Sequence, residues 1–564
     1  MSISASQREN ISSIFNGNLF VIPSYQRKYS WTNKERMELW NDIKEAKANT
    51  INHFFGTLIF KQTENENLDE VYEIIDGQQR TTTLFLLLNE LIERIEDSKK
   101  KASYKSKFII DNDNVKLSPL GADKEFLKKL LLDSKSMILN DLNKRSQKNL
   151  YDAKKQFQDL SSAFSEKEAL EIIDFIRKNV EVLVLVVEKQ SEAIRMFEII
   201  NDRGLELNYL DKVKSIAMLY STMYLNESLN NTINKNFEII FDSNDNIILK
   251  RDKLKILARF DETETLFSHH YTKSKQFFPD TWNYRNGVKT IFESFKNRCE
   301  KLKNNTIELE KFLKSYIEDF SNFAKSYSNL IDSIDKDKAK IEAFQFLDFS
   351  ATLYPLIVIL YQQNKLEDLL ETLVSVEVRV YKFKGTNPRA DIPTLCNNIS
   401  ESEWTIKKIN DWLILFRDKF MNNGNFEYYL DNAIYGNNAI KYILLKYKNN
   451  KVSFEEYQNL QIEHIFPDGG ENSVSFDVEE FGFKNIDDYN YTKNTLGNLI
   501  LLEKKLNASQ EVSDLTPKEK VNGYLKSNIE ETKQMAGIID KDGFEKKKIE
   551  NRTKDIVDFC LKQF

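Results

Sequence analysis

The sequence predicts an α+β protein that is mostly helical, and three observations support that fold class. Gly and Pro are scarce, with 16 and 8 among 564 residues, so few tight turns are expected. The stretch 305–327 repeats apolar residues every three or four positions, which is typical of an amphipathic helix. Short runs rich in β-branched and aromatic residues lie towards both ends of the chain and predict a few strands.

The first predicted region, residues 1–220, mixes strands with helices. Residues 53–60 (HFFGTLIF) and 71–76 (VYEIID) are expected to be strands, and residues 179–188 a buried strand, because β-branched and aromatic residues dominate them. Residues 81–97 follow the second strand closely and are expected to form a helix.

The remaining chain divides into two predicted regions, with soft boundaries because no Pro/Gly-rich linker marks them. Residues 221–400 are expected to be helical and carry no motif that indicates a chemistry, so they are interpreted as a coupling region or a homodimer interface. Residues 401–564 begin helical and then predict short strands around 461–466 and 496–502.

Composition limits the class of protein. The net charge is −6, which gives no overall signature of nucleic-acid binding, although a local basic groove would suffice. No stretch approaches the roughly 18 apolar residues of a membrane helix, and the N-terminus lacks a signal-peptide core, so a cytoplasmic protein without membrane contact is expected. Three scattered cysteines argue against a zinc cluster or a disulfide framework: Cys299, Cys396 and Cys560.

A strand followed by a glycine turn and a helix predicts an anion-binding position within residues 71–88. The glycine permits a tight turn, the first helical turn exposes unpaired N–H groups, and an arginine supplies a planar cation suited to phosphate. The two glutamines suit a base, a ribose or a water. An ordinary capped turn explains the same residues equally well. The residues assigned to this position are Asp76, Gly77, Gln78, Gln79, Arg80 and Thr81.

Two other segments favour a nucleotide over an ordinary turn. Residues 21–31 combine an arginine with aromatic side chains, which suits a stacked base next to phosphates. Residues 193–215 predict a helix that ends near Gly204 and a second helix after it, with polar side chains at the junction. An aromatic strand cap and a simple helix-cap turn are the alternatives. These segments add Tyr25, Gln26, Arg27, Asn201 and Arg203 to the predicted pocket, with Trp31 as a further stacking candidate.

A second cluster surrounds His464, one of four histidines, in the run QIEHIFPDGG. About thirty residues later, Gly497 and Asn498 open a second strand, and a helix bearing Asn507 follows. A strand, a loop, a strand and a helix with polar residues at the joints is the pattern of a ββα-metal nuclease, also called an HNH or His-Me finger nuclease. The sequence therefore predicts phosphodiester hydrolysis at this place.

The chemistry of phosphodiester hydrolysis explains the residue types. A histidine, with an ordinary pKa of about 6.5, suits a general base near neutral pH. Mg²⁺ or Mn²⁺ prefers oxygen ligands, which the Glu463 carboxylate and the Asn507 amide supply. Asn498 is expected either to act in catalysis or to fix the loop. Because neighbouring strand residues point to opposite faces, Glu463 and His464 share one site only where the strand ends, near Pro467.

These motifs resemble those of GmrSD-type modification-dependent (type IV) restriction enzymes. The matching runs are IPSYQRKYSW, FFGTLIF, IIDGQQRTTTL, FEIINDRGLELNYLDKVK, EHIFP and LGNLILL. The layout is also similar to that of the phage-defence proteins SspE and BrxU. The resemblance implies a ParB-like nucleoside triphosphatase domain over 1–220 and an HNH nuclease domain over 401–564. It also implies that His464 is the general base and that Glu463 and Asn507 hold the metal.

The leading hypothesis is a metal-dependent DNA endonuclease, regulated by GTP, ATP, CTP or UTP, that defends a bacterium by cutting modified or foreign double-stranded DNA. By analogy the target is glucosylated hydroxymethylcytosine DNA, phosphorothioate DNA or unmodified phage DNA. One alternative is a nucleotide-dependent nucleic-acid-binding or toxin-like protein whose nuclease domain is degenerate or acts on RNA. A ParB-like DNA clamp is another.

Several polar residues outside these sets have less specific interpretations. Asp468 stands where a glutamine is common in the family pattern, and its role is open. Lys518 and Lys520 are expected to contact the DNA backbone or to lie on a solvated helix face. The other three histidines are expected to take no part in catalysis, the last two for want of partners: His53, His269 and His270.

Overall fold

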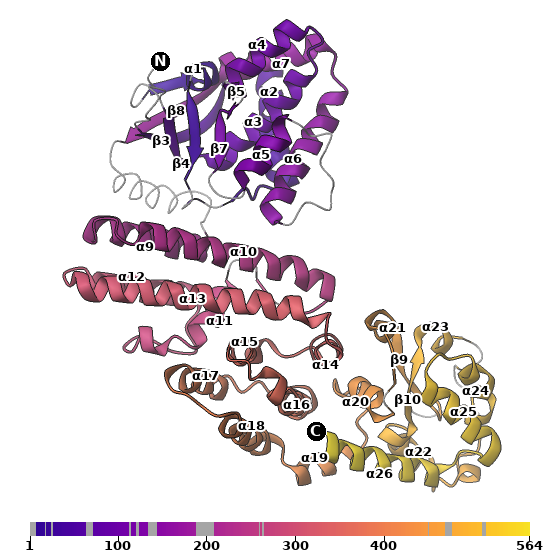
Figure 1. Cartoon of the computed structure of the whole chain (residues 1–564). Coiled ribbons are helices and arrows are strands. Elements are labelled where there is room, and N and C mark those ends of the chain that lie inside the picture. Colours follow the sequence, from indigo (N-terminus) through magenta and orange to yellow (C-terminus); the bar gives the residue numbers. More distant parts are fainter. Residues whose placement is uncertain are drawn as a thin grey trace. The chain divides into compact units, whose positions relative to one another are not determined.

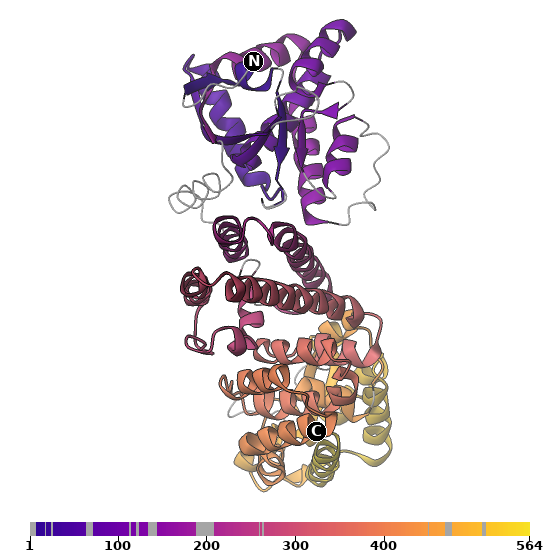
Figure 2. The ribbon, with the colours of Figure 1, turned by 60° about the vertical axis from the view of Figure 1, so that its left-hand side comes forward.

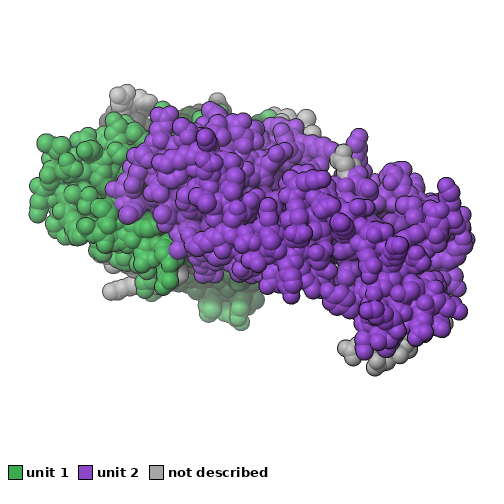
Figure 3. All heavy atoms as spheres, turned by 90° about the horizontal axis from the view of Figure 1, so that it is seen from below, with its two compact units in different colours: residues 1–249, 261–271, 277–328 green, residues 250–260, 272–276, 329–564 purple. Residues whose placement is uncertain are grey.

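A computed structural model of the chain divides into two compact units, which are coloured separately in Figure 3. Unit 1 comprises residues 1–249, 261–271 and 277–328, and unit 2 comprises residues 250–260, 272–276 and 329–564. The structure describes the chain apart from residues 1–6, 17, 24–25, 27, 64–70, 112–113, 120–122, 133–143, 188–207, 259, 262–263, 449, 469–475, 510–511 and 513–514.

Unit 1 is built on a mixed six-stranded sheet with the strand order β1-β8-β3-β4-β2-β7. Strand β3 pairs with β8 in parallel, whereas β4, its neighbour on the other side, runs antiparallel to β3. The buried strand residues, such as Phe60 and Val184, belong to one apolar core. The strands are β1 (Gln7–Asn10), β2 (Leu19–Ile22), β3 (His53–Thr63), β4 (Val71–Asp76), β7 (Leu117–Pro119) and β8 (Val180–Val187).

Helices gather on one side of this sheet, as Figure 1 shows. The helix after β4 lies deepest: almost all of its side chains, from Thr81 to Ile92, are buried because it packs into the core of the sheet and against three other helices. The helices and the two short strands among them are α1 (Ile11–Phe15), α2 (Asn33–Ala48), α3 (Gln78–Glu93), α4 (Ser98–Phe108), β5 (Ile110–Asp111), β6 (Asn114–Val115), α5 (Asp123–Leu132), α6 (Arg145–Ser162) and α7 (Glu166–Asn179).

After the last strand of the sheet, the chain forms a layer of long helices. Figures 1 and 2 show α9 (Tyr209–Tyr224) and α10 (Asn230–Leu254) beside α12 (Val288–Leu302) and α13 (Thr306–Ile334). Polar contacts join them, since the Tyr220 hydroxyl donates to Glu300 at 2.6 Å and the Asn246 amide donates to Ser328 at 2.8 Å. Both α10 and α13 begin in unit 1 and end in unit 2.

Among its described residues, unit 2 is helical except for one antiparallel strand pair, the hairpin of β9 (Leu460–His464) and β10 (Leu499–Glu503). Two apolar cores, one around Leu499 and one around Ile500, lie on the two faces of the hairpin. The helices named below are α19 (Asn423–Leu430), α22 (Ile486–Thr492), α23 (Lys504–Asn507), α24 (Pro517–Leu525) and α26 (Lys546–Gln563). The other helices of unit 2 are α14 (Lys338–Lys340), α15 (Tyr354–Gln362), α16 (Leu366–Val376), α17 (Asp391–Glu401), α18 (Ile406–Met421), α20 (Ile440–Tyr447), α21 (Phe454–Gln458) and α25 (Glu530–Asp542). Helix α11 (Thr265–Thr272) belongs to unit 1 as far as Tyr271.

The α+β, mostly helical class predicted from the sequence is confirmed, and so are the strands expected at 53–60, 71–76 and 179–188. The hairpin lies where short strands were expected in the last region. The division into three regions stays a prediction. Over the described residues, no helix is long and apolar enough to span a membrane.

Candidate active site and nucleotide pocket

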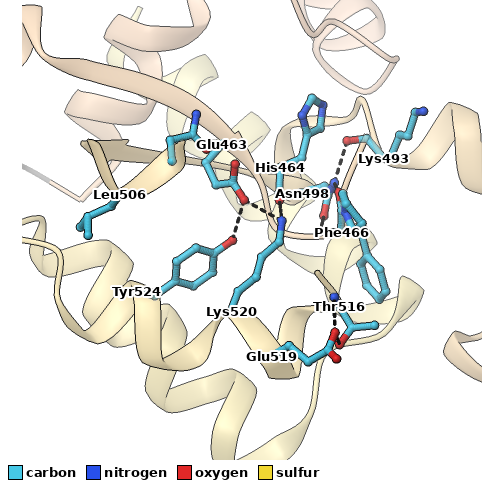
Figure 4. Close-up of polar contacts among 12 residues, drawn as sticks. Glu463, His464, Phe466, Lys493, Asn498, Leu506, Thr516, Glu519, Lys520 and Tyr524 are labelled. Atoms are coloured by element: carbon cyan, nitrogen blue, oxygen red, sulfur yellow. Dashed lines mark hydrogen bonds and ion pairs between the residues drawn. The ribbon is translucent and has the colours of Figure 1, made fainter. Parts of the chain in front are cut away.

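The hairpin places the predicted nuclease residues where β9 ends. His464 pairs with Leu499 and Glu463 with Ile500, so the two polar residues occupy the last two positions of the strand. Figure 4 shows that the Glu463 carboxylate points towards α24 and that the His464 ring points away from it. The two side chains therefore leave the strand on different faces, as the alternation of a strand requires.

Asn498 fixes the chain on both sides of this strand end. Its amide oxygen accepts from the Phe466 N–H at 2.8 Å, and its amide nitrogen donates to the carbonyls of Phe466 at 3.0 Å and Lys493 at 2.8 Å. The residue is fully buried. These three bonds use both ends of the amide, so Asn498 positions the loop after His464 and does not face the reaction.

The backbone next to Asn498 requires a glycine. A Cβ atom at Gly497 would lie 1.9 Å from the carbonyl oxygen of Ile549 in α26, which is far inside van der Waals contact. The Gly497 N–H also donates to the Thr553 hydroxyl at 2.9 Å. Helix α26 therefore supports the start of β10, and through it the strand pair.

His464 is held by an asparagine that the sequence did not single out. Its Nε2 lies 3.1 Å from Oδ1 of Asn494, which follows α22. The Tyr435 ring covers the imidazole at a centroid distance of 4.2 Å, and only 6% of His464 is exposed. Burial lowers the pKa of His464 below its ordinary value, and the bond to Asn494 opposes that shift. The neutral form of the imidazole is therefore favoured near pH 7.

Glu463 meets two side chains of α24. Its Oε1 accepts from the Lys520 ammonium at 2.7 Å and from the Tyr524 hydroxyl at 3.1 Å (Figure 4). The same ammonium donates to the His464 carbonyl at 2.6 Å. Burial raises the pKa of Glu463, and Lys520 opposes that shift. Because Lys520 is 1% exposed, it cannot contact DNA from a solvated helix face, and it acts here as the counter-charge of Glu463.

Asn507 lies on the Glu463 side of the hairpin. Its amide nitrogen donates to the side-chain oxygen of Gln461 at 3.0 Å, and Gln461 shares a strand face with Glu463. That bond leaves the amide oxygen of Asn507 for a cation. A carboxylate and an amide oxygen fit Mg²⁺ or Mn²⁺, which complete their shell with water and phosphate. Within the described ranges, no group of three or more His, Cys, Asp or Glu side chains forms a fuller metal cluster.

The lesser predictions in this region have clear outcomes. Asp468 forms an ion pair with Lys493 at 2.7 Å, which lowers the pKa of the Asp468 carboxyl. Its negative charge is therefore balanced by Lys493, whose carbonyl accepts from Asn498. Lys518 pairs with Asp540 at 3.0 Å on the surface. The expectation that His269 and His270 lack partners is wrong, because α11 packs on α13 and brings His270 within 2.8 Å of Asp319.

In unit 1, the turn between β4 and α3 borders a small pocket with a cavity volume of about 70 Å³. Gly77 adopts φ 93° and is the N-cap of α3, which confirms the predicted tight turn. The Thr81 N–H already donates to the Gly77 carbonyl at 2.9 Å, so the unpaired N–H groups belong to the three residues before it. The pocket is lined by Ile22, Pro23, Gln26, Lys28, Tyr29, Gln78, Gln79, Thr82, Pro119, Asp123, Leu127, Leu150, Glu238 and Phe241.

The three glutamines at this pocket have different tasks. Gln79 clamps the segment after β2, since its Oε1 accepts from the Ser30 N–H at 2.8 Å and its Nε2 donates to the Lys28 carbonyl at 3.1 Å. Gln26 donates to the Ile75 carbonyl at 2.5 Å. Gln78 is 7% exposed, and its Oε1 accepts no hydrogen bond. A buried amide oxygen without a partner is costly, so Gln78 is suited to a donor group of a ligand.

Arg80 points away from this pocket. Its guanidinium donates to the Phe55 carbonyl at 2.9 Å and the Thr57 carbonyl at 2.7 Å, and it pairs with Asp76 at 3.3 Å. A Cβ at Gly56 would lie 1.9 Å from Arg80 Nη1, so the guanidinium packs against the bare backbone of β3. The structure thus gives Arg80 and Asp76 a role in joining α3 to β3.

The other predicted pocket residues differ in what the structure shows. Tyr25, Arg27, Asn201 and Arg203 lie outside the described residues. Trp31 is partly buried against the core of unit 1 and does not line the pocket. Tyr29 belongs to the aromatic segment 21–31 but was not assigned to the predicted pocket. It lines the pocket, and its hydroxyl lies 2.8 Å from the Thr83 hydroxyl.

Two models of known protein families match the chain, one towards each end. Residues 11–218 match the N-terminal domain of the GmrSD restriction endonuclease, and residues 417–559 match the C-terminal domain of GmrSD restriction endonucleases. No curated protein matches the chain. The two family matches lie in the order that the motifs indicated, one over the pocket and one over the His464 hairpin. Together they cover more than half of the sequence, and the chain belongs to the GmrSD restriction endonuclease family.

Proposed function

We propose that the chain is a nucleotide-regulated DNA endonuclease that uses Mg²⁺ or Mn²⁺ and protects a bacterium from phage. The observation that carries the nuclease part is the oriented imidazole of His464 at the end of β9, on a chain whose family is that of a restriction endonuclease. The ParB-like and HNH names for its two domains belong to this proposal.

The hydrogen bonds around Asn494 support Nδ1 of His464 as the atom that acts as the proposed base. The amide nitrogen of Asn494 donates to the Asn490 carbonyl at 3.2 Å, so its oxygen faces the imidazole. An amide oxygen only accepts, hence Nε2 of His464 carries the proton. The lone pair of Nδ1 is then free to take a proton from the water that attacks the phosphodiester.

Glu463 and Asn507 would hold the metal. When bound, the cation neutralises the scissile phosphate and the leaving oxygen. The residues of the chain have separate tasks: Asn498 shapes the loop, Asn494 orients the base, and Lys520 keeps the buried Glu463 carboxylate charged. Because Lys520 already neutralises Glu463, a metal ion competes with that ammonium for the carboxylate.

The pocket at the start of α3 is the proposed nucleotide site. Its cavity volume is about 70 Å³, below the roughly 300–1,000 Å³ of small-molecule sites, so the pocket has to widen to admit a nucleotide. Unpaired N–H groups at the helix start attract phosphate, and the Gln78 amide oxygen offers an acceptor to a base or a ribose. GTP, ATP, CTP and UTP are all candidates, and the nucleotide is proposed to gate DNA cleavage.

The direct experiment measures cleavage of phage DNA and plasmid DNA by the full chain in Mg²⁺, with each of the four nucleotides and with none. We expect cleavage that depends on one nucleotide and stops with EDTA. A matched reaction on RNA tests the alternative of an RNA-directed toxin. Cleavage of RNA with intact DNA would replace the proposal by that alternative, and equal cleavage with and without every nucleotide would remove its regulatory part.

A further inference from the structure

One ion-paired cluster of unit 1 takes no part in the functions described so far. Asp242 of α10 binds two lysines: its Oδ1 pairs with Lys28, and its Oδ2 accepts from Lys144 at 2.8 Å. The three side chains are between a quarter and a third exposed. One carboxylate thus holds two ammonium groups that come from distant parts of the sequence.

Lys28 connects this cluster to the pocket at α3. It is the cation among the described residues that line the pocket, since Arg80 is bound to β3. Helix α10 forms part of the same wall through Glu238 and Phe241. A polyanion that enters the pocket therefore meets an ammonium group whose charge is already neutralised by Asp242.

A carboxylate and a phosphate bind to a pair of lysines in the same way. Both are anions whose oxygens accept charge-assisted hydrogen bonds from ammonium groups. A triphosphate carries more negative charge than one carboxylate, so it competes with Asp242 for Lys28 and Lys144. Once the triphosphate has displaced Asp242 from the lysines, the carboxylate lies beside an anion, and the repulsion disfavours the present packing of α10.

From this geometry we infer that Lys28 and Lys144 form a phosphate subsite, which Asp242 fills in the nucleotide-free chain. Binding of a nucleotide breaks both ion pairs and releases α10, whose last residues from Lys250 onwards belong to unit 2. The inference rests on the proposed nucleotide site. It adds that the site binds phosphate groups and that binding releases α10. Nothing in it requires hydrolysis of the nucleotide.

The test measures binding of inorganic triphosphate, and of each of the four nucleotides, by calorimetry on the full chain. Asp242→Asn removes the internal competitor and should bind the triphosphate roughly tenfold more tightly, the size expected of one charged hydrogen bond. Lys28→Met should bind it roughly tenfold more weakly, and the double variant should lose the gain of Asp242→Asn.

Glu238→Gln is the matched control. It removes the same charge from the same helix, one turn before Asp242. Among the described contacts Glu238 forms no ion pair with either lysine and acts on Lys144 only through space, so it measures the general electrostatic effect. If Glu238→Gln gains as much affinity as Asp242→Asn, general electrostatics explains the gain and the subsite is overturned. A larger gain for Asp242→Asn supports the subsite.

Hydrogen exchange of the α10 amides gives the second readout. Exchange in α10 should rise when nucleotide is added to the parent chain, and also in Asp242→Asn without nucleotide. Unchanged exchange in both overturns the release of the helix. If the parent binds neither triphosphate nor any nucleotide, the proposed nucleotide site fails too. If it binds a nucleotide but Lys28→Met binds equally well, only this inference fails.

Discussion

The side-chain oxygen of Asn494 lies 3.1 Å from Nε2 of His464, and this contact sets the orientation and the tautomer of the proposed general base. The two residues come from different elements, the end of β9 and the turn after α22. The predictions below follow from the surroundings of this pair and from those of the pocket in unit 1.

Asn494→Ala should slow DNA cleavage about three- to tenfold, because the lost hydrogen bond contributes about 0.5–1.5 kcal/mol to holding the imidazole. ¹⁵N NMR of the histidine ring should show the Nε2–H tautomer in the parent and a mixture of tautomers in the variant. Asn432→Ala is the control, since that asparagine accepts from Tyr491 and does not contact His464. Unchanged cleavage and an unchanged tautomer in Asn494→Ala would remove its orienting role.

The pH dependence of cleavage has a definite sign. The base works in its neutral form, and burial lowers the pKa of His464, so the neutral form persists to lower pH than for a free histidine. The kcat/KM for DNA should rise with pH through that pKa and level off above it, with a midpoint below about 6.5. A midpoint above that value, measured at constant ionic strength, would contradict the buried neutral imidazole.

The Mg²⁺ dependence of cleavage should distinguish the roles of Asn498, just before β10, and Asn507, in α23. Asn507→Ala should raise the Mg²⁺ concentration needed for half-maximal cleavage, because it removes a proposed ligand. Asn498→Ala should leave that concentration nearly unchanged and lower thermal stability, because its amide makes three buried bonds to backbone groups. Titration of Mg²⁺ and thermal unfolding of both variants check this. The reverse order would show that the two roles have been exchanged.

Arg80→Ala should destabilise unit 1 more than it weakens nucleotide binding. The guanidinium joins α3 to two carbonyls of β3, and a hydrogen bond from a charged group contributes about 1.5–3 kcal/mol. Urea unfolding should therefore show a loss of that order. Arg94→Ala is the matched control, because Arg94 donates to the Phe164 carbonyl on the surface. Normal stability with lost nucleotide binding would return Arg80 to the phosphate role that its sequence position suggests.

Local pattern predicts much of this fold. The β-branched and aromatic runs gave β3, β4 and β8 within a few residues, because their side chains fill a sheet that packs under helices. The Gly77 turn was predictable because a positive φ before a helix favours glycine. The order of strand, loop, strand and helix around His464 was also readable, since each joint carries a polar residue.

Side-chain partners far apart in the sequence were not predictable. Arg80 stands in the first turn of a helix, yet its helical phase turns it to β3 and not to the pocket. Lys520 reaches Glu463 across 57 positions, and Lys28 reaches Asp242 across 214. A lysine on a helix usually indicates a solvated face, so only the packing of α24 on β9 shows that Lys520 is buried.

The most direct test of the central claim is the rate of DNA cleavage by His464→Ala, measured beside the parent chain with saturating nucleotide and Mg²⁺. We expect the rate to fall by about 10²–10⁴-fold, the contribution of a general base, while the proposed nucleotide binding in unit 1 stays near the parent value. Cleavage at the parental rate by a folded His464→Ala chain would contradict the assignment of the active site.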